Sequence, residues 1–153
     1  MLSCVTTKKI TKTEDGFEMI HFKNDSIKHG KFKSYNTLGV LNRKMKYKNN
    51  LLHGKMAYYH PNGKIAGFYK SKSDTLTGPF KFFYPNGNKK FTINYLNNKP
   101  QEVINCYSPK KETISCGTLK NGNGYVIQYN DDGKFSSKDY YSNGNYLKSD
   151  TIL

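Results

Sequence analysis

Two stretches decide the fold: HGKMAYYHPNGK at residues 53–64 and TGPFKFFYPNGN at residues 77–88. Each runs from a glycine through a group of aromatic residues to a Pro-Asn-Gly sequence. Asn-Gly between apolar runs is a strong hairpin signal, because a type I′ turn needs two residues with positive φ. We therefore predict type I′ turns at residues 62–63 and 86–87, and at the Asp-Gly pair 132–133. The connection at residues 49–54 is predicted to be longer and looser.

The same landmarks recur along the chain at fixed offsets, which is typical of tandem repeats. A glycine begins each unit, an aromatic residue follows five positions later, and a second glycine follows nine positions later. The spacing from the third unit to the fourth is long enough for one degenerate unit near Pro100. The four units are Gly30/Tyr35/Gly39, Gly54/Tyr59/Gly63, Gly78/Phe83/Gly87 and Gly124/Tyr129/Gly133.

Strand positions after these turns alternate between apolar and basic residues. Leu41, Met45 and Tyr47 fall on one side of a strand, with Lys44 and Lys46 on the other. A period of two indicates a strand with one wet face. We predict an all-β fold: an elongated, single-sheet antiparallel meander of β-hairpin repeats of about 24 residues. Residues 1–13 are predicted to be a tether, 14–146 the repeat array and 147–153 a tail.

The repeat, best seen at residues 53–64 and 77–88, resembles the bacterial variant of the MORN (membrane occupation and recognition nexus) repeat over about residues 14–144. The resemblance is weakest at residues 99–116. It implies a β-hairpin array that serves as a binding scaffold. It also implies an antitoxin or immunity role for this chain, whereas other members of the wider class bind lipids or act as protein scaffolds.

The net charge of +14 lies entirely in the middle of the chain. Residues 26–101 hold fifteen basic residues and one acid, Asp74, while the remainder is balanced. This charge predicts an acidic partner, and the resemblance makes an acidic protein, in the sharpest form a cognate toxin, the expected one. A lysine-rich genome composition is the competing explanation. The residues predicted to bind the partner are Arg43, Lys44, Lys46, Tyr58, Lys64, Phe68, Lys70, Phe82 and Lys90.

Three other functions stay open at this point. Basic residues interleaved with aromatics suit single-stranded nucleic acid, although the chain has a single arginine, Arg43. A lysine face also suits an anionic membrane surface. A structural envelope protein without a specific ligand is the third alternative.

The cysteines bear on the cellular compartment. Met1-Leu2-Ser3-Cys4 resembles the end of a bacterial lipoprotein signal, which would make Cys4 a lipidated residue in the cell envelope. If Met1 is the native start, the prediction is a cytoplasmic protein. Cys106 and Cys116 either pair across a hairpin or stay as two small, half-buried residues.

Catalytic and metal-binding patterns are weak, so we predict a protein that is not an enzyme and has no cofactor and no metal. His29 and His53 occupy the same repeat position, which is typical of a structural residue. His53 and His60 lack nearby partners for a zinc set. The single acid in the middle of the chain argues against a paired acid–base site there.

Overall fold

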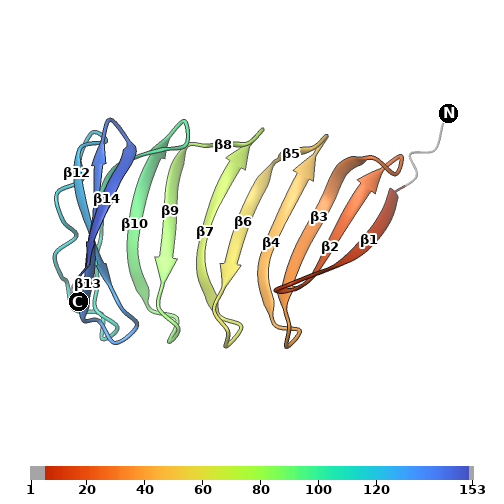
Figure 1. The fold of residues 1–153 in the computed structure, drawn as a ribbon. Helices are drawn as coiled ribbons and strands as arrows, with labels where there is room; N and C mark the ends of the chain where they lie inside the picture. The colour runs from red at the N-terminus through yellow and green to blue at the C-terminus, as the bar shows by residue number, and fades with distance from the viewer. Residues whose placement is uncertain (1–5, 152–153) are drawn as a thin grey trace. The chain divides into compact units, whose positions relative to one another are not determined.

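The computed structural model describes residues 6–151, in which every regular element is a β-strand (Figure 1). The chain divides into two compact units, residues 1–75 and 76–153. In both units consecutive strands pair antiparallel as hairpins. The prediction of an all-β fold made of tandem hairpins is therefore confirmed.

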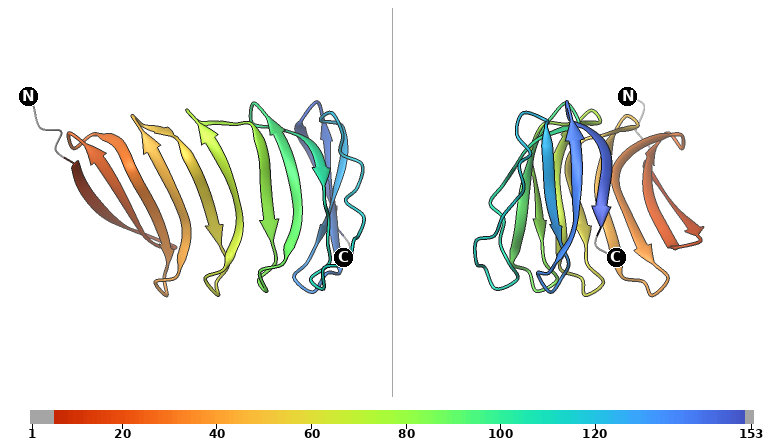
Figure 2. Two further views of the ribbon diagram at one scale, coloured as in Figure 1. Left: turned by 180° about the vertical axis from the view of Figure 1, so that it is seen from behind. Right: turned by 60° about the vertical axis from the view of Figure 1, so that its left-hand side comes forward.

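The first unit is one antiparallel sheet in which the strands follow sequence order. Each long strand pairs with the next one along the chain, and the short strand β5 pairs with the end of β4. Figure 2 shows that these strands bend and twist together. They are β1 (Thr6–Thr13), β2 (Gly16–Lys23), β3 (Ile27–Asn36), β4 (Leu41–Lys48), β5 (Leu51–Leu52), β6 (Gly54–Tyr59) and β7 (Ile65–Lys72).

The second unit contains two sets of strands. The first set continues the meander, whereas the last three strands form a separate sheet, so the expectation of one sheet does not extend to the end of the chain. The short strand β8 (Thr75–Leu76) lies at the boundary between the units. The first set is β9 (Gly78–Phe83), β10 (Lys89–Leu96) and β11 (Lys99–Ile104), and the second is β12 (Gly124–Tyr129), β13 (Phe135–Ser142) and β14 (Asn145–Thr151).

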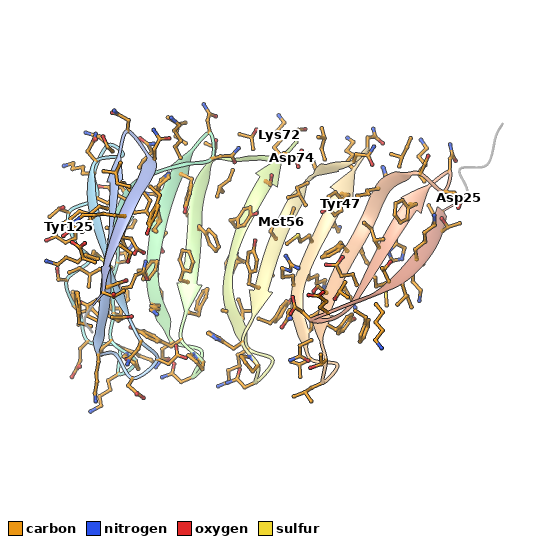
Figure 3. All side chains as sticks on the ribbon, viewed as in Figure 1. Asp25, Tyr47, Met56, Lys72, Asp74 and Tyr125 are labelled. Atoms are coloured by element: carbon orange, nitrogen blue, oxygen red, sulfur yellow. A yellow bond between two sulfur atoms is a disulfide. The ribbon has the colours of Figure 1, made fainter. Side chains whose placement is uncertain are left out.

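A small core holds the first unit together on one face of its sheet. Phe32, Met45 and Met56 are buried there, and Met56 is completely inaccessible to solvent. Tyrosines from neighbouring strands pack against them, among them Tyr47 and Tyr69. Tyr47 and Met56 carry labels in Figure 3. Because one sheet has no opposing layer, long side chains lying over their neighbours supply the burial.

The second unit has a two-layer core. Side chains of β10 and β11 meet those of the second sheet, with Ile93, Val103 and Val126 buried together. Cys106 is part of this core and forms a disulfide with Cys116, so the interpretation of two unpaired cysteines is wrong. The cross-linked segment between β11 and β12 replaces the degenerate repeat that the spacing allowed.

The type I′ turns do not lie at the Asn-Gly and Asp-Gly pairs where they were predicted, but at the connections that follow the second strand of each hairpin. Consecutive residues with positive φ occur at Asn49–Asn50, Ser73–Asp74 and Asn97–Asn98. At residues 60–63, by contrast, only Gly63 has positive φ, and its amide donates to the His60 carbonyl at 2.9 Å. That geometry is a turn closed by a left-handed glycine. The prediction failed because Asn and Asp also tolerate positive φ, and pairs of them were read as loop.

The type I′ turns hold successive repeats together. In each of three turns, the second residue makes two hydrogen bonds to the residue 22 positions earlier. Its backbone amide donates to the carbonyl of that residue, and its side-chain oxygen accepts from the amide of that residue. Asp74, the one acid of the basic middle, bonds in this way to Leu52, with 2.6 Å between the Leu52 amide nitrogen and Asp74 Oδ1. Asn50 and Asn98 make the same bonds to Lys28 and Leu76. Asp74 therefore has a structural role that asparagine fills elsewhere.

The ends of the array differ from the sequence prediction. Thr6–Thr13, assigned to a tether, form β1 and pair along their whole length with β2. Residues 147–151, assigned to a tail, belong to β14, which pairs with β13. Backbone pairing at the sheet edges explains both differences, because it needs no apolar side chains. The proposed lipidation site, Cys4, lies outside the described residues.

Candidate functional site

Four lysines form two directly opposed pairs on one face of the first unit's sheet. Lys31 of β3 lies directly opposite Lys46 of β4, and Lys55 of β6 lies directly opposite Lys70 of β7. Beyond the β4–β6 pair of Lys44 with Ala57 the register shifts by two residues, because Tyr47 pairs with Leu52 and the Lys46 carbonyl accepts the His53 amide. Lys46 and Lys55 are therefore not a directly opposed pair, but both line the same pocket on this face. Residues that face each other in antiparallel strands point to the same side of the sheet. All four side chains are exposed, and we call them the lysine row.

A second row runs alongside on the same face, two residues further along the strands. It begins with Lys33 opposite Lys44 and continues with Ala57 opposite Phe68. Ala57 is 5% exposed, and the Lys55 ammonium lies over the Phe68 ring, 4.1 Å from its centroid. The face is therefore basic along one row and changes from basic to apolar along the other.

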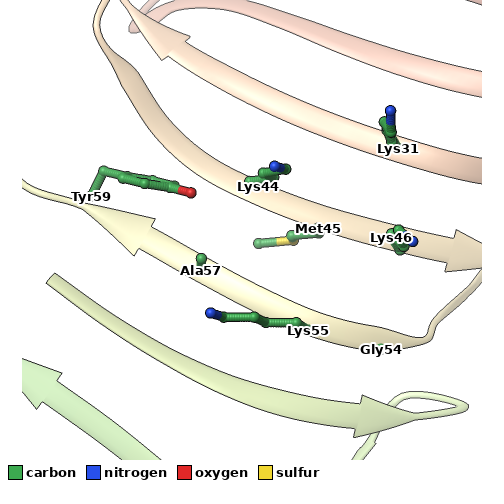
Figure 4. A pocket seen from close by; sticks show the side chains of 8 residues that line it. All are labelled: Lys31, Lys44, Met45, Lys46, Gly54, Lys55, Ala57 and Tyr59. Carbon is green, nitrogen blue, oxygen red and sulfur yellow. The ribbon is translucent and has the colours of Figure 1, made fainter. Parts of the chain in front are cut away.

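A pocket of about 310 Å³ opens within this face (Figure 4). It lies where β4 and β6 are paired over only two residue pairs. Lysines from β3, β4 and β6 surround it, and the remaining lining is apolar or aromatic. The lining residues are Lys31, Lys44, Met45, Lys46, Gly54, Lys55, Ala57 and Tyr59.

The charge on this face is uncompensated. Of the five acids in residues 6–75, only Glu18 lies on a strand, and it points to the opposite face; the other four lie in turns between strands. Within the described part of the chain, no lysine of either row belongs to an ion pair. Like charges directly opposite each other on a sheet are destabilising. The free protein therefore stores repulsion that an anionic ligand would relieve.

Only part of the predicted binding set lies on this face. Lys44, Lys46, Phe68 and Lys70 are brought together there. Sequence reasoning missed three members of the face. The alternation that placed Lys44 and Lys46, continued across the repeat glycines, would have found them: Lys31, Lys33 and Lys55.

Arg43 and Tyr58 lie on the opposite face, directly across from each other. The Arg43 guanidinium reaches Glu18, with 3.5 Å between Nη2 and Oε1. Arg43 adjoins Lys44 in a regular strand, so their side chains must point to opposite sides. Tyr47 shares this apolar face, and burial raises the pKa of its hydroxyl.

The other three residues predicted to bind a partner lie neither on the lysine face nor beside Arg43 and Tyr58. Lys64 lies in the turn before β7, where its amide donates to the Asn62 side chain. Phe82 packs against the core of the second unit. Lys90 is the extra residue of a β-bulge, which turns it to the core side, where its ammonium donates to the Tyr129 carbonyl. Burial lowers the pKa of Lys90, which is typical of a structural lysine.

The described histidines occupy structural positions in the strands and turns. Among residues 6–151, no cluster of three or more His, Cys, Asp or Glu side chains could hold a metal ion. His29 bonds to the Asn49 side chain at 3.2 Å, and the His53 amide donates to the Lys46 carbonyl. In the same residues no helix is long and apolar enough to cross a membrane.

The fold and this face define a hairpin-repeat protein with a lysine-rich sheet face. The family model described as the MORN repeat variant matches residues 28–49, 52–70 and 76–97. No curated protein matches the sequence. The chain is thus similar to this repeat over three consecutive stretches, and repeats of this kind are commonly protein- or membrane-binding modules. The first two of these stretches supply both rows of the lysine face.

Proposed function

We propose that this protein is a non-enzymatic binding module that docks an acidic protein on the lysine face of its first unit. The lysine row carries the proposal, because it gathers four exposed lysines on one face, as two directly opposed pairs, with no acid on the strands between them. Unpaired like charges cost stability in the free protein and are relieved when carboxylates dock. They also accelerate encounter with an acidic surface at low salt. An antitoxin or immunity role is the sharpest form of this proposal.

Two features favour protein over nucleic acid. Arginine is the residue best suited to bidentate phosphate contacts, and Arg43 is held on the opposite face by Glu18. Phe68, the aromatic residue in the rows, already has the Lys55 ammonium over its ring, which disfavours base stacking on that side. An anionic membrane is an alternative outcome of the test, since lysines suit it equally well.

The disulfide supports an extension of this proposal to the compartment. Disulfides persist in oxidising compartments and are rare in the cytosol. We propose that the chain matures outside the cytosol and meets its partner there. Alkylation of the protein from its native host should leave Cys106 and Cys116 unlabelled until a reductant is added. Complete labelling without reductant would overturn this part of the proposal.

The docking proposal is tested by affinity purification from the native host at low and moderate salt. The wild type is compared with Lys46→Gln/Lys55→Gln and with a matched control, Lys110→Gln/Lys134→Gln, whose exposed lysines lie outside the face. We expect one acidic protein in near-equal amount with the wild type and the control, and its loss from the row variant. Recovery of nucleic acid or lipid, or equal capture by all three, would overturn the proposal.

A further inference from the structure

The last sheet of the second unit has an open edge. In its order β12–β13–β14, no strand within residues 6–151 pairs with the outer side of β14. All seven residues of β14 are exposed, and two of them, Tyr146 and Leu147, are large apolar residues. An edge of unpaired backbone groups is a template for another strand. We propose that this strand is β14 of a second copy, which joins the two sheets into one across a two-fold axis.

The edge strand of the first unit, β1, is protected in a way that β14 is not. It carries three exposed lysines and no acid: Lys8, Lys9 and Lys12. Pairing between two such edges would bring only positive charges together, and edge lysines are a common protection against strand pairing. β14 instead has one lysine and one acid, Lys148 and Asp150, and no proline. Edge pairing is therefore disfavoured at β1 and open at β14.

The strand pairing determines which backbone groups of β14 point outward. The Tyr125 carbonyl accepts amide bonds from the segment before β12, so Tyr125 points its backbone groups away from β13. Backbone groups alternate in direction along a strand, so Val126 points toward β13 and bonds to its partner there, Asp139. The backbone groups of Asp139 are thereby used, and its other neighbour, Ser149, points its amide and carbonyl to the open edge. Thr151, two residues further along, does the same.

A two-fold axis allows few registers for this edge. Pairing between two identical strands about a two-fold axis is antiparallel and isologous. Outward-pointing residues must face each other, because only they have backbone groups to share. Ser149 therefore lies opposite Ser149 or Thr151 of the second copy, or the two Thr151 residues lie opposite each other.

The charges of β14 select one of these registers. With Ser149 opposite Ser149, Lys148 of each copy lies directly opposite Asp150 of the other. With Ser149 opposite Thr151, the two Asp150 residues oppose each other, which is destabilising. The third register brings no lysine opposite an acid. The edge is therefore complementary to itself in the first register alone.

The free protein holds these two charges ready for the exchange. Lys148 Nζ lies 2.9 Å from Asp150 Oδ1 on the same exposed strand. Pairing replaces this bond within one strand by two bonds between strands, so the charges choose the register and the backbone bonds hold the copies together. Two strands of seven residues bury less than the roughly 1,200 Å² of a stable interface, so the expected dimer is a weak one.

The dimer would change how the lysine row acts. The pairing uses no residue of the first unit, so each dimer carries two lysine rows. A partner with two acidic surfaces could then bind both rows, and its second contact would form at the high effective concentration set by the first. This consequence rests on the proposed function, whereas the pairing itself does not.

The test is the association of the protein in solution at low salt. Analytical ultracentrifugation over a wide range of concentrations compares the wild type with two charge variants, Lys148→Asp and Asp150→Lys. The two variants are also mixed in equal amounts, with a fluorescent label on one of them. A double variant, Lys148→Asp/Asp150→Lys, exchanges the charges, and Lys12→Asp on β1 is the matched control. Circular dichroism verifies that each variant keeps its β structure.

We expect the wild type to form a dimer whose fraction rises with concentration. Each single variant at β14 should raise the dissociation constant about tenfold, because like charges then oppose each other. The mixture should form heterodimers and the double variant homodimers with the wild-type dissociation constant, and Lys12→Asp should associate like the wild type. A wild type that stays monomeric at every concentration, or a dimer that neither β14 variant weakens, would overturn the proposal.

Discussion

The two units bury their apolar side chains in different ways. Both are built from the same hairpin repeat, but residues 6–75 form one sheet, whereas residues 76–151 add a second sheet and a disulfide. In the first unit, methionines and tyrosines cover one another on a single face. In the second unit, residues of two facing sheets exclude water together. The repeat therefore determines the hairpins, whereas the residues that follow it determine how each unit keeps water from its apolar core.

The comparison also separates structural from functional residues. Lys55 and Lys70 form a directly opposed pair in the first unit, and 24 residues later Pro79 and Asn94 form the corresponding pair. Both pairs lie in the same kind of hairpin. The repeat thus folds without lysine at these positions, so the lysine row is not a requirement of the fold. This supports its assignment to binding.

The largest expected effect concerns the disulfide. Cys116→Ser should lower the unfolding free energy of the second unit by about 2–3 kcal/mol, because the closed loop no longer restricts the unfolded chain. Hydrogen exchange should show faster exchange in β10–β12 and little change in β3–β6. An equal loss of protection in both units would show that they unfold as one body and would break the comparison.

Met56 is the corresponding test of the first unit. Met56→Ala removes the fully buried side chain of the single-sheet core and should cost about 2–3 kcal/mol. This loss of unfolding free energy lies at the low end for core truncations, because the side chains of a single sheet can relax into the cavity that the truncation leaves. Urea unfolding of the wild type and variant measures it, with Met19→Ala as the control. Met19 lies on the lysine face, opposite Lys33, so its loss should cost less.

Asp74 tests the bonds between successive repeats. Asp74→Ala should cost about 1–2 kcal/mol, because the Leu52 amide loses its acceptor and alanine resists the positive φ of this turn. Asp74→Asn keeps both properties and should stay within about 0.5 kcal/mol of wild type. Thermal unfolding compares the three proteins. A large loss in Asp74→Asn would mean that the charge itself matters.

The lysine row predicts a smaller effect of opposite sign. Lys31→Gln removes one member of the pair opposite Lys46 and should stabilise the free protein by about 0.5 kcal/mol at low salt. The gain should disappear at about 1 M salt, where charges are screened within about 3 Å. Lys134→Gln serves as the control and should change little. No gain in Lys31→Gln at low salt would mean that the row stores no repulsion.

The last prediction concerns how stability changes with pH, a change that Tyr141 causes only in the alkaline range. Burial, followed by the nearby Asp139, raises the pKa of Tyr141 to about 12 from its usual 10.0. A raised pKa means that Tyr141 contributes stability below pH 10.0 that is lost as pH rises toward about 12. Tyr141→Phe should therefore unfold less steeply with pH above 10.0. Chemical unfolding at pH 8 and in this alkaline range measures the difference, and equal pH slopes would contradict it.

Much of the fold and half of the site could be predicted from local sequence. Fixed glycine and aromatic offsets indicated the hairpins, because each repeat must bury its apolar side against its neighbours. Alternation placed Lys44 and Lys46 on one face correctly. Arg43 and Tyr58 were grouped with them on charge and aromaticity alone, although alternation places both on the other face. Lys90 was missed for another reason, since a bulge breaks the alternation on which the prediction relied.

The sequence by itself determined the repeat, the strand polarity and the position of the net charge, since these follow from side-chain periodicity over a few residues. Only the tertiary structure decided which turns bond across 22 residues, where the second sheet begins, and that Cys106 meets Cys116. It also decided that four lysines, spread over 40 residues, lie on one face of the sheet as two opposed pairs. These features depend on strand register, and register is set by pairing between segments distant in sequence.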